Sequence, residues 1–304
     1  MSTEGAGQTR PVITEPAAVP ARADADRPAV TCVIASRNRR DDLLDSLPRH
    51  EAPVVLVDNA STDDTVEAVR RAHPEVTVVP LPRNVGAVAR TIGVRHADTP
   101  YVAFTDDDSW WAPGDLARAV AVMEAHPRLG LLAARILVGP EETLDPVCTV
   151  MAESPLGTDP DLPGPSLLGF VACGAMVRAE AFTAVGGFDD VVRFPGEEER
   201  LALDLAAAGW GLAYVDGVTV HHHPSTRREA SAVRQAGLWR SRVLTALMRY
   251  PAGDLAGQLL RTVRAGRLGL RGLAGALPRV PAALRRRRVL PTTVMTGVRE
   301  LRDR

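Results

Sequence analysis

The sequence predicts an α/β domain built on a mainly parallel β-sheet, and three observations lead to this prediction. Residues 29–138 alternate short runs rich in Val and Ile with longer helical stretches. The strand runs are apolar on both faces, which is typical of a parallel sheet covered by helices on both sides. The chain has 304 residues, 45% hydrophobic and 24% charged, and this ordinary composition excludes disorder throughout and a collagen-like repeat.

The predicted elements alternate regularly in the first half of the chain. Strands are expected over 29–35, 54–58, 76–80, 101–105 and 129–138. Helices are expected over 41–47, 64–72, 85–96 and 113–125. This order of elements predicts a Rossmann-like arrangement.

The second half is less regular. Residues 139–165 are rich in Pro, Gly and acidic residues, which predicts a long loop or a small irregular layer. Order returns over 167–177, a turn is expected at Gly186-Gly187, and a helix over 197–208 precedes strands near 212–215 and 218–222. From residue 226 onward the pattern predicts helices, whereas residues 1–27 are expected to form a disordered leader without an export signal.

The cysteine content and hydropathy exclude several classes of protein. Cys32, Cys148 and Cys173 are odd in number and far apart, so neither a disulfide framework nor a zinc knuckle is expected. A reducing compartment, the cytoplasm, is therefore predicted. The longest charge-free run, 162–177, is too short and too rich in Pro and Gly for a membrane-spanning helix.

Polar residues follow the predicted parallel strands at the edge where an open α/β sheet binds its ligands. Ser36 and Arg37 follow the first strand, Asp58 closes the second, and Asp106-Asp107-Asp108 follow the fourth. No GxGxxG stands after the first strand, so no glycine loop is available for a pyrophosphate. Either the three carboxylates bind Mg²⁺ or Mn²⁺, or they form a solvated acidic turn before the next helix.

Two further clusters carry titratable side chains. Gly196-Glu197-Glu198-Glu199 opens a helix, where acidic residues are favoured by the helix dipole. Helical spacing places Glu198 on the face of Leu201 and Leu205, so burial would raise its pKa and make it the preferred general base, with Glu197 second.

The other cluster is His221-His222-His223, which ends a predicted strand. Alternation along the strand sends His222 to one face and its neighbours to the other, unless the run is simply an exposed turn. An imidazole at this position would suit Mn²⁺.

Six segments, in this order, resemble the signature of family 2 glycosyltransferases with the GT-A fold. They are TCVIASRNR (Thr31–Arg39), VVLVDNASTDDT (Val54–Thr65), Asn84–Gly86 with Arg90, FTDDD (Phe104–Asp108), VGGFDD (Val185–Asp190) and GEEERL (Gly196–Leu201). The resemblance runs over 30–225 and implies a GT-A domain at 28–225. Its nucleotide-sugar half would be 28–138 and its acceptor half 139–225.

The resemblance implies transfer of a sugar, with inversion, from a nucleotide-diphosphate donor to a hydroxyl acceptor. The implied nucleotide-sugar-binding residues are Ala35, Ser36, Arg37, Asp58, Gly86, Arg90, Asp106 and Asp107. The implied ligands of Mn²⁺ or Mg²⁺ are Asp106, Asp108 and His222, and Glu198 stands where the family usually has its catalytic Asp. Because glutamate is one methylene longer than aspartate, either Glu197 or Glu198 could face the acceptor. The alternative is an inactive binding or scaffold protein of this fold. A sugar-nucleotide nucleotidyltransferase is a less favoured alternative.

Trp110 and Trp111 follow the acidic cluster, and the sequence leaves two roles open for them. They could stack on a sugar or acceptor, or they could cover the core at a helix start.

The charge of the chain is distributed unevenly. The net charge is −1, but residues 261–304 contain twelve Arg against Glu300 and Asp303, a net of +10, which leaves −11 on residues 1–260. This profile does not suggest a nucleic-acid-binding protein. The basic helical extension over 226–304 either contacts an anionic membrane surface or packs on the acidic body or a second subunit. Membrane contact would suit a lipid-linked acceptor at the inner face of the cell membrane.

Overall fold

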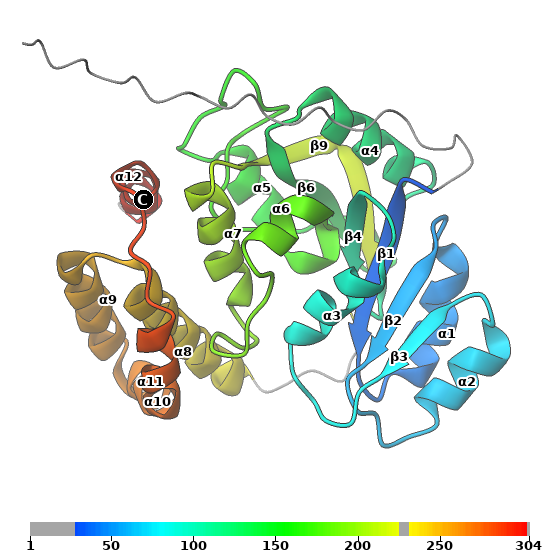
Figure 1. Cartoon of the computed structure of the whole chain (residues 1–304), viewed down its shortest axis with the longest axis horizontal. Helices are drawn as coiled ribbons and strands as arrows, with labels where there is room; N and C mark the ends of the chain where they lie inside the picture. The colour runs from blue at the N-terminus through cyan, green and yellow to red at the C-terminus, as the bar shows by residue number, and fades with distance from the viewer. Residues whose placement is uncertain (1–27, 225–230, 303–304) are drawn as a thin grey trace, which may run out of the picture.

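The computed structural model describes residues 28–224 and 231–302, and it has an α/β fold with helices on both faces of one sheet (Figure 1). The predicted leader over 1–27 lies outside the described residues. The sheet has nine strands in the order β3-β2-β1-β4-β8-β6-β9-β5, with β7 paired to β6. The predicted fold class is therefore confirmed.

Four parallel strands form the first half of the sheet. They are β1 (Val30–Ser36), β2 (Val54–Asp58), β3 (Thr77–Pro80) and β4 (Tyr101–Thr105). Nearly all residues of β1, β2 and β4 are buried, because helices cover them on both faces. The apolar runs in the sequence are a direct consequence of this double burial.

The second half of the sheet is mixed. Its strands are β5 (Ser109–Trp111), β6 (Leu129–Val138), β7 (Thr143–Leu144), β8 (Ala175–Arg178) and β9 (Gly211–His222). Strand β8 is antiparallel to both β4 and β6, whereas β6 and β9 are parallel. The two strands predicted near 212–215 and 218–222 are one strand, whose register against β6 shifts between Ala134 and Arg135.

Two groups of helices cover the two faces of the sheet. Helices α3 (Val88–His96), α5 (Pro146–Ala152), α6 (Ala179–Ala184) and α7 (Glu197–Ala207) pack on one face. Helices α1 (Arg40–Ser46), α2 (Thr65–Ala72) and α4 (Asp115–Ala125) pack on the other. Helix α5 and strand β7 give the predicted irregular segment 139–165 a small amount of regular structure.

The C-terminal extension is helical, as predicted. It contains α8 (Ser231–Arg249), α9 (Ala252–Arg264), α10 (Gly266–Ala276), α11 (Val280–Arg285) and α12 (Thr292–Glu300). Short 3₁₀ turns occur at Leu47–Arg49, Ala172–Gly174 and Leu277–Arg279. None of the described helices is both long and apolar enough to cross a membrane.

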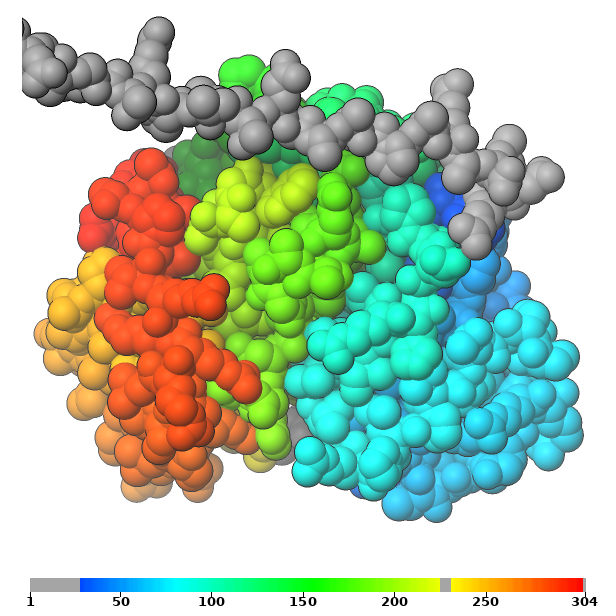
Figure 2. Space-filling view, in the orientation of Figure 1, coloured from blue at the N-terminus to red at the C-terminus, as the bar shows by residue number. Residues whose placement is uncertain are grey.

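The extension packs against α7 through an apolar cluster and a buried polar network. Leu203 of α7 packs with Tyr250, Val294 and other apolar residues of the extension. Figure 2 shows the extension, in orange and red, lying against the green part of the chain.

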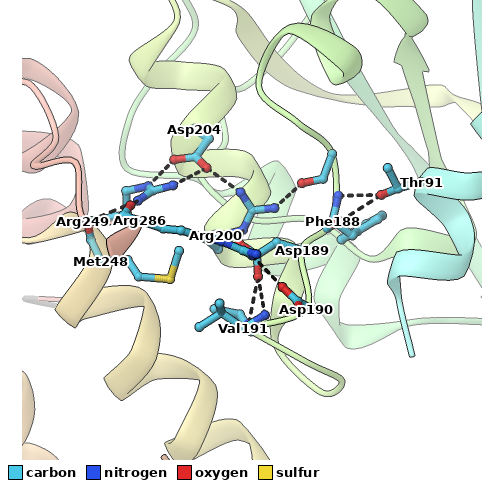
Figure 3. A network of polar contacts seen from close by, with 12 residues as sticks. Thr91, Phe188, Asp189, Asp190, Val191, Arg200, Asp204, Met248, Arg249 and Arg286 are labelled. Carbon is cyan, nitrogen blue, oxygen red and sulfur yellow. Dashed lines mark hydrogen bonds and ion pairs between the residues drawn. The ribbon is translucent and has the colours of Figure 1, made fainter. Parts of the chain in front are cut away.

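In the polar network, shown in Figure 3, the Asp204 carboxylate accepts hydrogen bonds from the guanidinium groups of Arg200 and Arg249. Arg200 belongs to α7 and Arg249 ends α8, so this carboxylate joins the two helices.

The predicted turn at Gly186-Gly187 is present, and both glycines have positive φ angles, of 82° and 61°. A Cβ atom at Gly187 would lie only 2.5 Å from Cε1 of Phe182 and 2.8 Å from Oγ1 of Thr91, whereas a Cβ at Gly186 would meet nothing within 4 Å. Thr91 also holds the next residue, since its hydroxyl exchanges hydrogen bonds with the backbone of Phe188. The turn therefore needs glycine at 187 for space as well as for backbone conformation.

We expect Gly187→Ala to lower the free energy of unfolding by about 1–3 kcal/mol more than Gly186→Ala does, because only the first adds a steric clash to the backbone strain. Urea unfolding of both variants checks this difference. Equal losses of unfolding free energy in the two variants would show that backbone strain alone accounts for the need for glycine at both positions.

Candidate functional site

The carboxyl ends of β1 and β2 bring several predicted site residues together. Ser36 and Asp58 are register partners in the two parallel strands. The Asn59 backbone N–H donates to the Ser36 carbonyl over 2.8 Å, and the Asp58 carboxylate accepts hydrogen bonds from the backbone and hydroxyl of Ser61. Ala35, one residue earlier on β1, is partly buried. This end of the sheet is thus preorganised by local hydrogen bonds.

Arg37 and Gly86 lie on the loops that border this end of the sheet. Arg37 is exposed, and its Nε donates to the carbonyl of Ala60 over 3.1 Å. Gly86 has a φ of 64°, and its carbonyl accepts from Nδ2 of Asn59 over 3.0 Å. The Asn59 Oδ1 also accepts from the backbone N–H of Val85 over 2.7 Å. The buried Asn59 therefore fixes the Gly86 loop, a positioning role that the sequence analysis missed.

The three carboxylates of the acidic cluster point to three different partners. The Asp106 Oδ1 lies 2.5 Å from Nη2 of Arg90. The Asp107 Oδ2 accepts from the Ser36 hydroxyl over 2.7 Å, and Oδ1 of Asp108 lies 3.3 Å from Nε2 of His222. Burial raises the pKa of Asp107 to about 7, although the Ser36 hydrogen bond opposes this shift. The cluster is therefore built into the site and is not a solvated turn.

Asp106, Asp108 and His222 could hold one metal ion. One ligand atom from each of these side chains lies within 4.8 Å of the others. Two carboxylates and an imidazole suit Mn²⁺, and the carboxylates also suit Mg²⁺. Among the described residues, this is the group of His, Cys, Asp and Glu side chains with a geometry fit for a metal.

Strand alternation explains how His222 reaches this cluster while its neighbours do not. The ring of His221 stacks on Trp110 at a centroid distance of 5.6 Å, and its Nδ1 lies 2.8 Å from Oε1 of Glu142. The ring of His223 also contacts Trp110, at 4.8 Å. Because β5 pairs with β9, these contacts hold the strand that presents His222 to Asp108.

The two tryptophans of β5 differ in their surroundings. Trp111 is 2% exposed and packs in the hydrophobic core with Leu116 and Val220, so of the two roles left open by the sequence, covering the core is the one that Trp111 has. Trp110 is 8% exposed, and the Arg49 guanidinium lies 4.3 Å from its ring centroid. For Trp110, acceptor contact stays a prediction.

Arg90, in the first turn of α3, connects the acidic cluster to the start of α7. Burial alone would lower the pKa of its guanidinium, but three nearby carboxylates raise that pKa above its ordinary value. These carboxylates belong to Asp106, Glu197 and Glu198. The fold thus brings carboxylates from the β4–β5 turn and from α7 close to the Arg90 guanidinium of α3.

The structure corrects the predicted burial of the two glutamates. Glu197 is 1% exposed, whereas Glu198 is only half-buried. The helical pattern predicted the reverse, because it considers only the sheet side of α7. Helix α8 also approaches the residue just before α7, since a Cβ at Gly196 would lie 3.2 Å from Cβ of Ser241.

The electrostatic environment raises the pKa of both carboxylates. For each, burial is the largest cause, and the charge of Glu198 adds to the shift of Glu197. Neither carboxylate oxygen of Glu197 has a hydrogen-bond partner among the described residues. Of the two glutamates, Glu198 is therefore the one whose side chain is accessible to a ligand. The buried Glu197 carboxyl group favours the neutral form.

Comparison with known proteins gives consistent similarities. The model of the family described as "Glycosyl transferase family 2" matches residues 31–186. An N-acetylglucosaminyl-diphospho-decaprenol L-rhamnosyltransferase of Mycobacterium tuberculosis is 27% identical over 241 residues, which cover 62% of this chain and 77% of the relative. An uncharacterized glycosyltransferase of Mycobacterium bovis is 33% identical over 192 residues, covering 62% and 84% of the two chains.

Solved structures share the fold. A mannosyltransferase from Pyrobaculum calidifontis, solved in complex with GDP-Man and Mn²⁺, superimposes with a TM-score of 0.56 at 24% identity, covering 85% of this chain and 74% of that one. S. aureus TarS 1–349, in complex with UDP-GlcNAc, gives a TM-score of 0.53 at 15% identity, covering 83% and 72%.

Proposed function

Because the chain belongs to glycosyl transferase family 2, we propose that it transfers a sugar, with inversion, from a nucleoside-diphosphate donor to an acceptor hydroxyl. The observation that carries this proposal is the convergence of a metal-ligand set, a largely buried arginine and a partly exposed glutamate with a raised pKa. The donor complexes of the structural neighbours, with GDP-Man and UDP-GlcNAc, support a nucleotide sugar as the donor.

The donor binds at the carboxyl ends of β1, β2 and β4. Ala35, Ser36, Arg37 and Asp58 border the nucleoside, with Gly86, Arg90 and Asp107 beside them. Asp106, Asp108 and His222 would hold Mn²⁺ or Mg²⁺, which would supply positive charge near the departing diphosphate. Arg90 orients Asp106 through their ion pair and adds positive charge to the same region.

Glu198 is the general base. It takes the proton of the acceptor hydroxyl while the acceptor oxygen forms a bond to the anomeric carbon from the side opposite the diphosphate. The bond between that carbon and the diphosphate oxygen breaks at the same time, and its electron pair leaves with the nucleoside diphosphate. A single displacement of this kind inverts the anomeric carbon and needs no nucleophile on the enzyme.

The acceptor in this proposal is linked to a lipid. The M. tuberculosis relative is named for a decaprenol-diphosphate-linked acceptor, and the basic extension suits a chain that works at an anionic membrane surface. In this assignment, residues 28–138 bind the donor, residues 139–225 bind the acceptor, and residues 226–304 form the extension.

We expect the chain to release nucleoside diphosphate from UDP-, GDP- or dTDP-sugars only when Mn²⁺ or Mg²⁺ is added, because carboxylates without a cation would repel the negatively charged diphosphate. Asp108→Ala should weaken Mn²⁺ binding by roughly 10- to 100-fold, since it removes one of three ligands. Calorimetric titration of Mn²⁺ and an assay of diphosphate release check both statements. Glu67→Ala, an exposed acidic residue of α2, is the matched control. Release that does not depend on metal in either variant, or no release from any donor, would contradict the proposal.

The nucleoside of the donor can be identified with a thermal-shift screen. A ligand that binds only the native state raises the melting temperature by mass action, so the matching nucleotide should give the largest shift in the presence of Mn²⁺.

A further inference from the structure

The segment from α10 through α11 exposes three large apolar side chains along one side. Leu270, Leu277 and Leu284 are 54%, 67% and 52% exposed. With the exposed Ala274 and Pro281 they follow one another at alternating spacings of four and three residues. The two helices are joined by the 3₁₀ turn Leu277–Arg279, and the backbone at its two junctions, Leu277 and Val280, stays in the right-handed helical region. We call these five residues the Leu270 stripe; their spacing places them on one face.

The face of this segment that packs on the protein carries mainly small residues, together with the partly buried Leu273. Gly269, Gly272, Ala276 and Ala283 are buried. A Cβ at Gly272 would lie 2.6 Å from Cβ of Trp239 and 2.9 Å from the backbone N of Arg240, so close packing against α8 requires glycine there. An ordinary amphipathic helix buries its leucines and exposes small or polar residues. Here three leucines of the stripe are more than half exposed, so packing within this chain does not account for them.

The charge around the Leu270 stripe identifies the kind of partner that covers it. Exposed arginines flank the stripe at positions 267, 271, 285 and 288. Between Asp254 and Glu300 the chain has ten Arg and no Asp or Glu. If the stripes of two copies packed together, their arginines would face each other without a carboxylate, and like charges would oppose that contact. The partner must therefore be apolar at its centre and anionic around it.

We propose that the Leu270 stripe and its flanking arginines dock on an anionic phospholipid surface. The leucines enter the boundary between headgroups and acyl chains, while the arginines bind lipid phosphates. Long arginine side chains reach the headgroups while their aliphatic stems remain near the apolar boundary. In Figure 1, α10 and α11 lie at the lower edge of the view, toward which β1 and β2 also run. The inference deepens the proposed function, because a membrane-bound chain would meet a lipid-linked acceptor in the same surface.

The test uses flotation of the full chain with vesicles, without any substrate. We expect binding to vesicles of phosphatidylcholine mixed with phosphatidylglycerol, and at least about tenfold weaker binding to phosphatidylcholine alone. The double variant Leu270→Ser with Leu277→Ser, and separately Arg267→Gln with Arg271→Gln, should each reduce binding to the mixed vesicles by about tenfold or more. One variant removes apolar side chains and the other removes positive charges, so misfolding of one variant would leave the other as a test. Circular dichroism checks that both variants are folded.

The matched control is Val150→Ser with Val233→Ser, since these residues are 69% and 59% exposed on α5 and α8, outside the stripe. It should bind mixed vesicles like the unaltered chain. The inference is overturned if the unaltered chain ignores anionic vesicles, if the control loses binding as much as the stripe variants, or if the stripe variants instead dissociate a dimer in sedimentation analysis. Metal-dependent release of nucleoside diphosphate, measured in the same preparations, separates failure of this inference from failure of the proposed function.

Discussion

Glu198→Gln is expected to lower kcat by about 10²- to 10⁴-fold while nucleoside-diphosphate binding is kept. Glutamine has nearly the same shape as glutamate but cannot accept the acceptor proton at neutral pH. The loss should therefore appear in the transfer rate and not in the affinity for the donor. Transfer kinetics with saturating donor, together with calorimetric titration of the nucleoside diphosphate, check the two parts separately.

Glu197→Gln is the matched control for this variant, because Glu197 is the adjacent residue and differs mainly in being buried. We expect its kcat to fall by less than about tenfold, since a side chain that is 1% exposed has no surface for an acceptor. If Glu197→Gln lost more activity than Glu198→Gln, the assignment of the base would be wrong and Glu197 would take that role.

Glu197→Gln is also expected to change the stability of the protein, because the pKa of Glu197 is raised. Below its unfolded pKa the side chain is neutral in both states, so burial of the carboxyl costs little there. As the pH rises through the higher folded pKa, the buried group must ionise, and stability is lost. Glu197→Gln should therefore be more stable than the unaltered chain at neutral and alkaline pH, and the difference should shrink in acid. Urea unfolding across this pH range checks the sign.

The pH profile of transfer reports on Glu198 directly. Its raised pKa means that kcat should increase with pH through an apparent pKa above the ordinary glutamate value of about 4.3. In Glu198→Gln the residual activity should lose this rise. A profile unchanged by the substitution would show that another group takes the proton.

Asp204→Asn is expected to have the largest effect on stability, about 3–5 kcal/mol of unfolding free energy. The Asp204 carboxylate binds two guanidinium groups that are almost inaccessible to solvent, those of Arg200 (3% exposed) and Arg249 (7% exposed). Replacing the carboxylate by an amide leaves two buried positive charges with less compensation. Arg200 would retain the hydrogen bond from its guanidinium to the Gly187 carbonyl and the 3.3 Å contact of its Nε with Oδ2 of Asp189, but it would lose its contact with the Asp204 carboxylate. Urea unfolding measures the loss.

Asp190→Asn provides the control for this network, because it also breaks an ion pair between the body and the extension. The Asp190 and Arg286 side chains are 61% and 47% exposed, and the contact between Oδ1 and Nη1 is 2.6 Å. Exposed pairs of this kind contribute roughly 0–1 kcal/mol. Similar losses in the two variants would show that burial does not determine the contribution of the network.

Much of the fold could be predicted because its determinants are local. The runs that form β1, β2, β4 and β6 are apolar and β-branched, and a doubly covered parallel sheet requires that composition. Strand β5 was missed because three residues are too few to show a period, and it forms only because β9 pairs with it. The helix at α5 was missed because its seven residues lie in a segment rich in turn-forming residues.

The residue types of the candidate site were also evident in the sequence, but their partners were not. Alternation predicted that His222 would leave the face shared by His221 and His223, and the contacts agree with this. The role of Asn59 in fixing the Gly86 loop was missed because the two residues are far apart in the sequence.

The sequence by itself determined the order of the longer strands and helices in residues 29–138, the glycine turn and the acidic cluster, since these depend on neighbours along the chain. Only the tertiary structure decided which glutamate is buried, because the helical repeat of α7 does not show which other segments approach its first turn. The packing of elements likewise decided that Trp111 belongs to the core and that Asp204 joins two helices. Desolvation and ion pairing depend on every surface that approaches a group, and those surfaces come from segments distant in sequence.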